Sequence, residues 1–171
     1  LRFDPDDTLS AIERHQATDA LLIPTMTLAL IELKKKARRK LPTLTAVLSS
    51  GGRAPAYLWD AIRDWLGPVE ITTGYGMTEC TASTTVTRPD DPPEKLLETN
   101  GRLRDAGTAG VPELGRRLVE YRVLDPGTGT DVPPGEVGEL VAKGPGVTSG
   151  YYRNDAATAA AFTPDGWLHT G

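Results

Sequence analysis

The 171-residue sequence lacks several features that would place it in particular classes of protein. Cys80 is its only cysteine, so no internal disulfide can form and nothing indicates an oxidising compartment. No run approaches the roughly 20 apolar residues that cross a bilayer, and the first residues lack the apolar middle of a signal peptide. We therefore expect a cytoplasmic protein without a transmembrane segment.

The sequence also has no general excess of basic residues. Its formal net charge is -4, and basic residues concentrate only in residues 34–40. A duplex-binding domain usually shows a basic face, so we expect no nucleic-acid partner. The local run could bind phosphate or an anionic surface. We favour the solvated carboxyl end of a helix, where cations oppose the negative end of the helix dipole.

What is present is the composition of a globular protein, 39% hydrophobic and 25% charged, with apolar helices and short strands alternating over the first ninety residues. The predicted elements are a helix over 8–16 capped by Asp7 or Thr8, a strand over 20–23, a helix opening at Pro24, a strand over 44–48, a helix over 55–66 stopped by Gly67-Pro68, and a strand over 69–72. Strands separated by helices imply a parallel sheet with right-handed crossovers. Ligands gather where such strands end, so we expect the glycine turns at 51–52 and 74–76 on one edge.

The pattern changes after Thr87. We predict a long loop over 89–100, then strands over 119–124 and 137–142 joined through a turn at 126–129, and a short helix over 155–162 before a turn at 165–167. The fold class expected is thus α/β: a layered subdomain with a parallel sheet over residues 1–100, followed by a small antiparallel, barrel-like subdomain over 101–171.

Residues 74–79 read Gly-Tyr-Gly-Met-Thr-Glu and carry the most informative chemistry. We expect Tyr75, Thr78 and Glu79 to place a flat ring, a small hydroxyl donor and an anionic metal ligand on one tight turn. A magnesium nucleotide needs all three. A phosphate loop of the Gly-x-x-x-x-Gly-Lys type does not occur in the sequence.

Five phrases, in this order, resemble the adenylate-forming superfamily of acyl-CoA synthetases, luciferases and peptide-synthetase adenylation domains. They are Ser50-Gly51-Gly52, Tyr75-Gly76-Met77-Thr78-Glu79, Gly135-Glu136-Val137-Gly138-Glu139-Leu140, Gly150-Tyr151-Tyr152 and Gly166-Trp167-Leu168-His169-Thr170-Gly171. Any one phrase could arise by chance, but five in the same order make coincidence improbable. The resemblance spans essentially the whole chain.

The resemblance implies an enzyme that joins a carboxylic acid to AMP, expels pyrophosphate and passes the acyl group to the thiol of coenzyme A. Its cofactors would be ATP, Mg²⁺ and coenzyme A. Thr78 and Glu79 would be the catalytic residues, with the Thr78 hydroxyl on the α-phosphate and the Glu79 carboxylate on the metal. Tyr75 would stack on adenine, which is worth roughly 1–3 kcal/mol by analogy with nucleic-acid bases.

Four glycines complete the nucleotide-binding set that the resemblance implies. Gly51 and Gly52 would line the adenine and acyl sites. Gly74 and Gly76 would let the backbone approach the ligand where a side chain would collide. In relatives an aspartate that binds ribose follows the position of Gly171. We therefore expect an internal fragment of the large N-terminal domain, missing N-terminal and C-terminal parts of the same enzyme and inactive alone.

The sequence does not identify the carboxylic acid that is activated, nor whether the acyl acceptor is coenzyme A or a carrier protein. Met77 and the segment Gly166-Trp167-Leu168 resemble acyl-CoA ligases more than peptide-synthetase domains. Aliphatic, aromatic and dicarboxylic acids all remain possible, with Met26, Ser50 and Thr73 as candidate pocket residues. The alternatives are a noncatalytic nucleotide-binding or scaffold domain, and an adenylation domain that loads an amino acid onto a carrier protein. Trp167 is expected to pack, and His15 and His169, for which the sequence indicates no partner carboxylate, to be structural or solvated.

Overall fold

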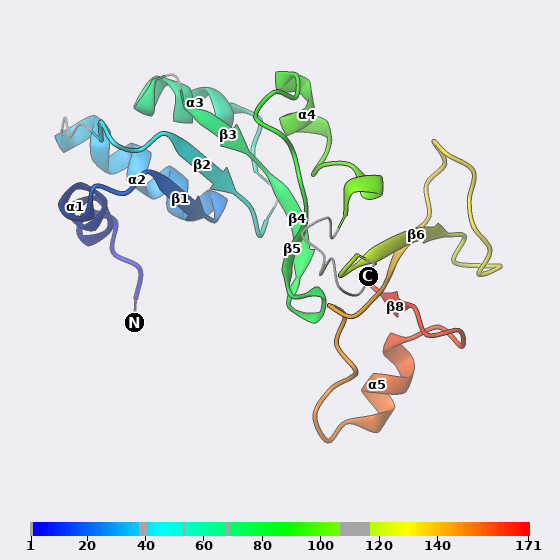
Figure 1. The fold of residues 1–171 in the computed structure, drawn as a ribbon. Helices are drawn as coiled ribbons and strands as arrows, with labels where there is room; N and C mark the ends of the chain where they lie inside the picture. Colours follow the sequence, from blue (N-terminus) through cyan, green and yellow to red (C-terminus); the bar gives the residue numbers. More distant parts are fainter. Residues whose placement is uncertain (1, 38–40, 53, 68, 107–116) are drawn as a thin grey trace. The chain divides into compact units, whose positions relative to one another are not determined.

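The computed structural model describes residues 2–37, 41–52, 54–67, 69–106 and 117–171 (Figure 1). The chain forms two compact units. The first unit contains Leu1–Tyr75 and Val86–Gly101, and the second contains Gly76–Thr85 and Arg102–Gly171. The domain boundary expected after residue 100 stays a prediction, because a compact unit need not be an independently folding domain.

The first unit is built on a three-stranded parallel sheet, as the sequence predicts. The sheet has the order β1-β2-β3, with β1 at Asp19–Leu22, β2 at Ala46–Ser49 and β3 at Glu70–Thr72. The first unit also contains helices α1 at Pro5–His15, α2 at Pro24–Ala37 and α3 at Tyr57–Leu66. The central strand β2 pairs with both neighbours, so all three carboxyl ends lie at one edge of the sheet.

Local chemistry explains where the first helix begins and ends. Asp4, rather than Asp7 or Thr8, is the cap: its carboxylate accepts hydrogen bonds from the backbone amides of Asp6 and Asp7 at 2.9 and 3.0 Å. Pro5 follows at the first helical position, where a missing N–H is harmless. Gln16 ends the helix in the left-handed conformation.

The core of the first unit lies between the helices and the sheet. Its fully buried side chains include Leu9, Leu30, Val47, Leu58 and Ile62. The predicted apolar face of α3 is confirmed for Leu58 and Ile62, while Leu66 is only half-buried. Pro68, the second residue of the predicted stop, and residues 38–40 of the basic run lie outside the described residues.

The prediction of a long loop over residues 89–100 is wrong for residues 93–98. Helix α4 spans Pro93–Glu98, and Leu96 is buried in the core of the first unit. The segment is proline-rich and acidic and has no clear period, which favoured a loop, yet Pro93 stands at the start of the helix, where its fixed φ is favourable.

The second unit contains a three-stranded antiparallel sheet of order β6-β7-β8. Its strands are β6 at Glu120–Leu124, β7 at Glu139–Lys143 and β8 at Leu168–His169, and helix α5 spans Asp155–Ala161. Val119, Ala142 and Leu168 are buried and form its core together with Cys80. The predicted antiparallel unit is therefore present, whereas the two-residue β8 is too short for its pattern to show.

A further pair of strands was not predicted. Strand β4 at Gly74–Met77 and strand β5 at Ala82–Val86 form a two-stranded sheet, joined by the 3-10 helix η1 at Thr78–Cys80. Tyr75 therefore lies in a strand, and only Thr78 and Glu79 lie in the turn that follows. The glycines on either side of Tyr75 lower strand propensity, which made the segment look like one continuous turn.

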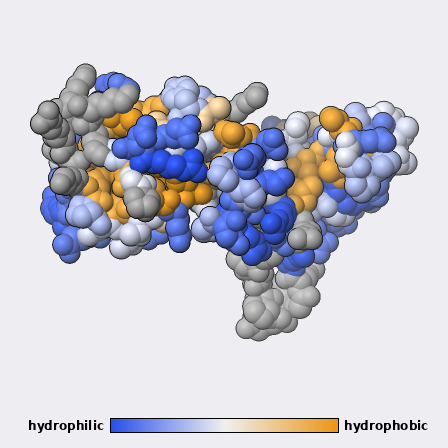
Figure 2. All heavy atoms as spheres, turned by 90° about the horizontal axis from the view of Figure 1, so that it is seen from above, coloured by the Kyte–Doolittle hydropathy of each residue, from blue (hydrophilic) through white to orange (hydrophobic). Residues whose placement is uncertain are grey.

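The surface combines hydrophilic areas with exposed hydrophobic ones, coloured orange in Figure 2. Large hydrophobic side chains that are mostly exposed include Leu21, Tyr57, Val137 and Tyr152. Within the part of the chain that the structure describes, no helix combines the length and apolar character needed to cross a membrane.

Candidate functional site

The first part of the candidate site is the glycine turn that follows β2. Gly51 has a φ of +85°, and a Cβ added there would lie 3.2 Å from Cγ2 of Ile23. A side chain would therefore be strained by the backbone and crowded at the same time. Gly52 is less constrained, since its added Cβ would lie 3.9 Å from Cδ of Pro24, an ordinary contact.

This turn is tied to the start of β4. The buried Ser50 hydroxyl donates to the carbonyl oxygen of Gly74 at 2.9 Å. Thr73, one residue earlier, exchanges hydrogen bonds with Thr87: its amide donates to the Thr87 hydroxyl at 2.9 Å, and its carbonyl accepts from the Thr87 amide at 2.8 Å. The glycine turn at 51–52 and Gly74 thus lie together at the carboxyl edge of the sheet, and the half-buried Tyr75 follows Gly74.

The second part of the site is helix η1 in the second unit. Cys80 is 1% exposed and anchors η1 in the core of that unit, and burial raises the pKa of its thiol. Thr81 then adopts the left-handed conformation, and its amide donates to the carbonyl of Thr78 at 3.2 Å. This closed turn leaves Thr78 exposed and Glu79 half-buried.

Glu79 is held from the loop that precedes α5. The amide of Thr148 donates to the backbone carbonyl of Glu79 at 2.7 Å. The phenol of Tyr151 donates to Oε1 of the Glu79 carboxylate at 3.0 Å, and this hydrogen bond raises the pKa of Tyr151. Sequence reasoning missed the contact, because its partners are 72 positions apart and the phrase Gly150-Tyr151-Tyr152 suggests no partner.

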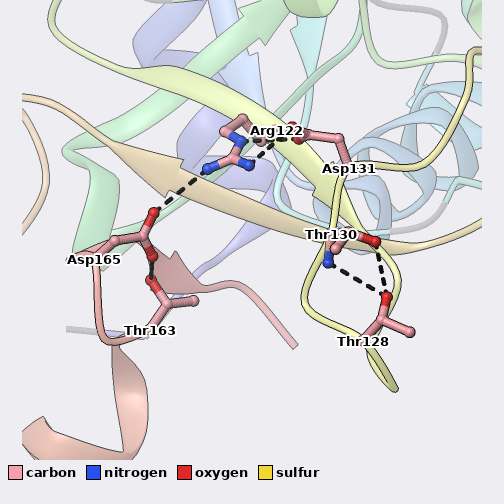
Figure 3. A network of polar contacts seen from close by, with 6 residues as sticks. All are labelled: Arg122, Thr128, Thr130, Asp131, Thr163 and Asp165. Carbon is pink, nitrogen blue, oxygen red and sulfur yellow. Dashed lines mark hydrogen bonds and ion pairs between the residues drawn. The ribbon is translucent and has the colours of Figure 1, made fainter.

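The same unit contains a polar network in which Arg122 contacts Asp131 and Asp165 (Figure 3). The Arg122 guanidinium donates two hydrogen bonds of 2.8 Å to Asp131 and lies 3.5 Å from Asp165. Trp167 lies beside this network: Cζ of Arg122 is 5.1 Å from the centre of its ring, and Nζ of Lys143 is 5.7 Å from it. The hydrogen bond from Arg122 lowers the pKa of Asp131. Trp167 therefore contacts two cations, which accords with a packing role.

His169 has a partner that the sequence did not reveal. Its Nδ1 lies 2.9 Å from Oε1 of Glu139 on the neighbouring strand β7. The expectation of a histidine without a partner carboxylate is therefore corrected. The pair was hidden because β7 and β8 meet across thirty positions of sequence.

The predicted site residues divide between the two units. Gly51, Gly52, Gly74 and Tyr75 belong to the first unit, and Gly76, Thr78 and Glu79 belong to the second. Within the first unit the glycine turn and Gly74 lie together, and within the second Thr78 and Glu79 share one turn.

Comparison with known proteins settles the family. The sequence pattern of the family described as AMP-binding enzyme matches residues 1–152. The chain belongs to this AMP-binding enzyme family. Its similarity extends to individual relatives. It is 32% identical to the putative acyl-CoA synthetase YngI of Bacillus subtilis and 34% identical to feruloyl-CoA synthase of Amycolatopsis, each over 169 residues. It is also 32% identical over 170 residues to pyochelin synthase PchD of Pseudomonas aeruginosa.

Solved structures agree with this assignment. Amide bond synthetase McbA of Marinactinospora thermotolerans matches with a TM-score of 0.74 at 32% identity, and O-succinylbenzoate coenzyme A synthetase MenE of Bacillus subtilis with 0.73 at 28%. Each match covers 99% of this chain but only 31% and 32% of the solved chains. The AMP-binding chain likewise spans 29% of YngI, 31% of feruloyl-CoA synthase and 28% of PchD.

The residues of this AMP-binding chain fit a magnesium nucleotide. Mg²⁺ is usually held by one or two carboxylates together with phosphate oxygens and waters, rather than by a cage of protein ligands. Glu79 offers one half-exposed carboxylate beside the exposed hydroxyl of Thr78. The described residues contain no cluster of three or more His, Cys, Asp or Glu that could hold a metal without a nucleotide.

Proposed function

We propose that the protein containing this chain is an AMP-forming acid–thiol ligase, which activates a carboxylic acid with ATP and transfers the acyl group to coenzyme A. The observation that carries the proposal is the η1 turn: within a chain of the AMP-binding enzyme family, it presents the hydroxyl of Thr78 and the carboxylate of Glu79 at adjacent positions. The similarity to YngI and feruloyl-CoA synthase supports coenzyme A as the acceptor.

The proposed reaction has two steps. A carboxylate oxygen attacks the α-phosphorus of ATP as the bond to pyrophosphate breaks, which leaves an acyl-adenylate. The thiolate of coenzyme A then attacks the acyl carbon, the thioester forms, and AMP departs with the electron pair of the broken C–O bond. Negative charge shifts toward pyrophosphate in the first step, so catalysis consists mainly of positioning and charge neutralisation.

Each site residue has a role in the first step. Glu79 would hold Mg²⁺, which neutralises the phosphate oxygens when bound. The Thr78 hydroxyl would donate to an α-phosphate oxygen. Tyr75 would stack on adenine, and Gly51, Gly52, Gly74 and Gly76 would admit the ligand close to the backbone.

The test is exchange of labelled pyrophosphate into ATP by the full-length protein, measured over a panel of aliphatic, aromatic, dicarboxylic and amino acids. Exchange should require one class of acid. Glu79→Gln should lower the exchange rate about 100-fold or more, because it removes the charged metal ligand. Glu136→Gln is the matched control, since Glu136 is exposed in the turn before β7 and has no proposed role. Exchange by Glu79→Gln at the parent rate would overturn the metal assignment.

Tyr75→Ala should act on nucleotide binding. We expect the Km for ATP to rise about 5- to 150-fold, the equivalent of roughly 1–3 kcal/mol of lost stacking. Tyr75→Phe keeps the ring and should stay near the parent value. If Tyr75→Ala leaves the ATP dependence unchanged, Tyr75 does not contact adenine.

A second candidate is an adenylation domain that loads a carrier protein, favoured by the 32% identity to pyochelin synthase PchD. The two candidates differ in the acceptor. After the acid panel has identified the substrate, formation of free acyl-CoA supports the ligase, whereas transfer only to the phosphopantetheine of a carrier protein supports the alternative. A protein that binds ATP but exchanges pyrophosphate with no acid would be a noncatalytic nucleotide-binding domain.

A further inference from the structure

We propose that Tyr151 is a positioning residue for the Glu79 carboxylate, an inference that rests on the function proposed above. The phenol lies 3.0 Å from Oε1 of Glu79, and it is the only side chain in the described ranges that donates to this carboxylate. A hydrogen bond to one oxygen restricts rotation of the carboxylate about its last side-chain bond. The other oxygen, Oε2, is then presented in a defined direction to a cation.

Further hydrogen bonds connect the same two segments of the second unit, which are distant in sequence. The amide of Thr148 donates to the carbonyl of Glu79 at 2.7 Å, and the hydroxyl of Thr81 donates to the carbonyl of Gly146 at 2.7 Å. One bond is made by Glu79 itself, and the other by Thr81, the residue that follows η1. The loop that carries Tyr151 is therefore fixed to the same short turn that carries Glu79.

The backbone at Tyr151 is held from its other side by α5. The amide of Tyr151 donates to the hydroxyl of Thr158 at 2.9 Å, and that hydroxyl donates to the carbonyl of Asn154 at 2.9 Å. Gly150 has a φ of +145°, and a Cβ added there would lie 2.6 Å from Cγ2 of Thr158. Only glycine allows this close approach, so the phenol starts from a backbone position that the surrounding chain determines.

A packing role alone does not account for the phenol. Tyr151 is 41% exposed, so water can satisfy its hydroxyl when the Glu79 carboxylate does not. The neighbouring Tyr152 differs: it is 85% exposed, and the centre of its ring lies 5.1 Å from Cζ of Arg153. Within the described part of the chain, its hydroxyl makes no hydrogen bond to a carboxylate. Tyr152→Phe is therefore the matched control for Tyr151→Phe.

The experiment measures metal binding directly, using Mn²⁺ with the α,β-methylene analogue of ATP, which cannot be cleaved at the reacting bond. Bound Mn²⁺ is followed by electron paramagnetic resonance on the full-length protein. Tyr151→Phe should weaken Mn²⁺ binding in the presence of the analogue about tenfold, the lower end of the effect of removing a hydrogen bond to a metal ligand. Tyr152→Phe should bind as the parent does, and both variants should keep the parent's thermal midpoint.

Activity gives a second readout. In pyrophosphate exchange, Tyr151→Phe should need about tenfold more Mg²⁺ for half-maximal rate and should approach the parent rate when Mg²⁺ is saturating, because the ligand itself remains. A purely structural tyrosine would lower stability without shifting the Mg²⁺ requirement.

The outcomes separate this inference from the proposed function. If Glu79→Gln weakens Mn²⁺ binding and Tyr151→Phe does not, the positioning role is refuted while the metal assignment stands. If Glu79→Gln leaves Mn²⁺ binding at the parent level, both the metal assignment and the positioning role are refuted. A tenfold loss in Tyr151→Phe that Tyr152→Phe does not share supports the inference.

Discussion

Two adjacent serines at the end of β2 should respond to the same substitution with opposite signs. Ser49 and Ser50 are both buried, at 1% and 7% exposure. The Ser50 hydroxyl donates to the carbonyl of Gly74 at 2.9 Å, whereas the Ser49 hydroxyl has no hydrogen-bond partner among the described residues. Replacement by alanine therefore removes a hydrogen bond at one position and an unsatisfied hydroxyl at the other.

The magnitudes follow from these environments. A neutral hydrogen bond contributes about 1 kcal/mol net, so Ser50→Ala should destabilise the edge of the sheet by about that amount. A buried hydroxyl without a partner costs about 1–3 kcal/mol, so Ser49→Ala should stabilise by about 1 kcal/mol after the loss of some packing. The two variants should then differ by about 2 kcal/mol, or about 30-fold in the equilibrium between closed and open states.

Amide hydrogen exchange of the full-length protein is the suitable assay, because it reports local opening free energies even where global unfolding is not two-state. Peptides covering β2 and β3 should exchange faster in Ser50→Ala and more slowly in Ser49→Ala. Ser50→Thr, which keeps a hydroxyl, is the control for the lost hydrogen bond. If both alanine variants change exchange in the same direction, the hydrogen-bond reasoning is refuted.

The remaining predictions concern backbone strain and pH. Gly101→Ala should lower the free energy of unfolding by about 3 kcal/mol, since φ is +102° and the new Cβ would lie 2.6 Å from the carbonyl oxygen of Val86. Gly129→Ala, at φ +69° with open space around it, should lower it by only about 1 kcal/mol. Equal denaturation midpoints for the two variants would contradict this difference. The folded-state pKa values of Asp131 and Asp165 lie below the usual carboxyl range. Their contribution to the free energy of unfolding is therefore complete above about pH 4 and is lost as the pH falls through the folded-state pKa values. Asp131→Asn should flatten the acid branch of a stability profile followed by tryptophan fluorescence, and an unchanged branch would argue against the network.

Much of the architecture could be predicted from local patterns. The spacing of Leu58 and Ile62 indicated the buried face of α3, and the alternation of strands with helices indicated the parallel sheet. Both signals reflect burial of apolar side chains at a regular period. The wrong predictions occurred where composition misled: the proline-rich, acidic composition of 89–100 favoured a loop although Pro93 begins α4, and the glycines beside Tyr75 concealed a strand.

The candidate site was predictable only as a set of residue types. Gly51, Tyr75, Thr78 and Glu79 were identified from their order along the chain, and their assignment to a nucleotide stays a prediction. The partners of the site residues were not predictable. The bonds from Ser50 to Gly74 and from Tyr151 to Glu79 join positions 24 and 72 apart, and neither has a local signal.

The amino-acid sequence by itself determined the family, the fold class and the residue types of the candidate site, because these follow from motif order and from short periodic patterns of burial. Only the tertiary structure decided which groups hold those residues in place: the carbonyl that Ser50 binds, the phenol that contacts Glu79 and the carboxylate beside His169. The physical reason is that a hydrogen bond depends on distances of about 3 Å between atoms, and chain packing brings these atoms together without regard to their separation in sequence.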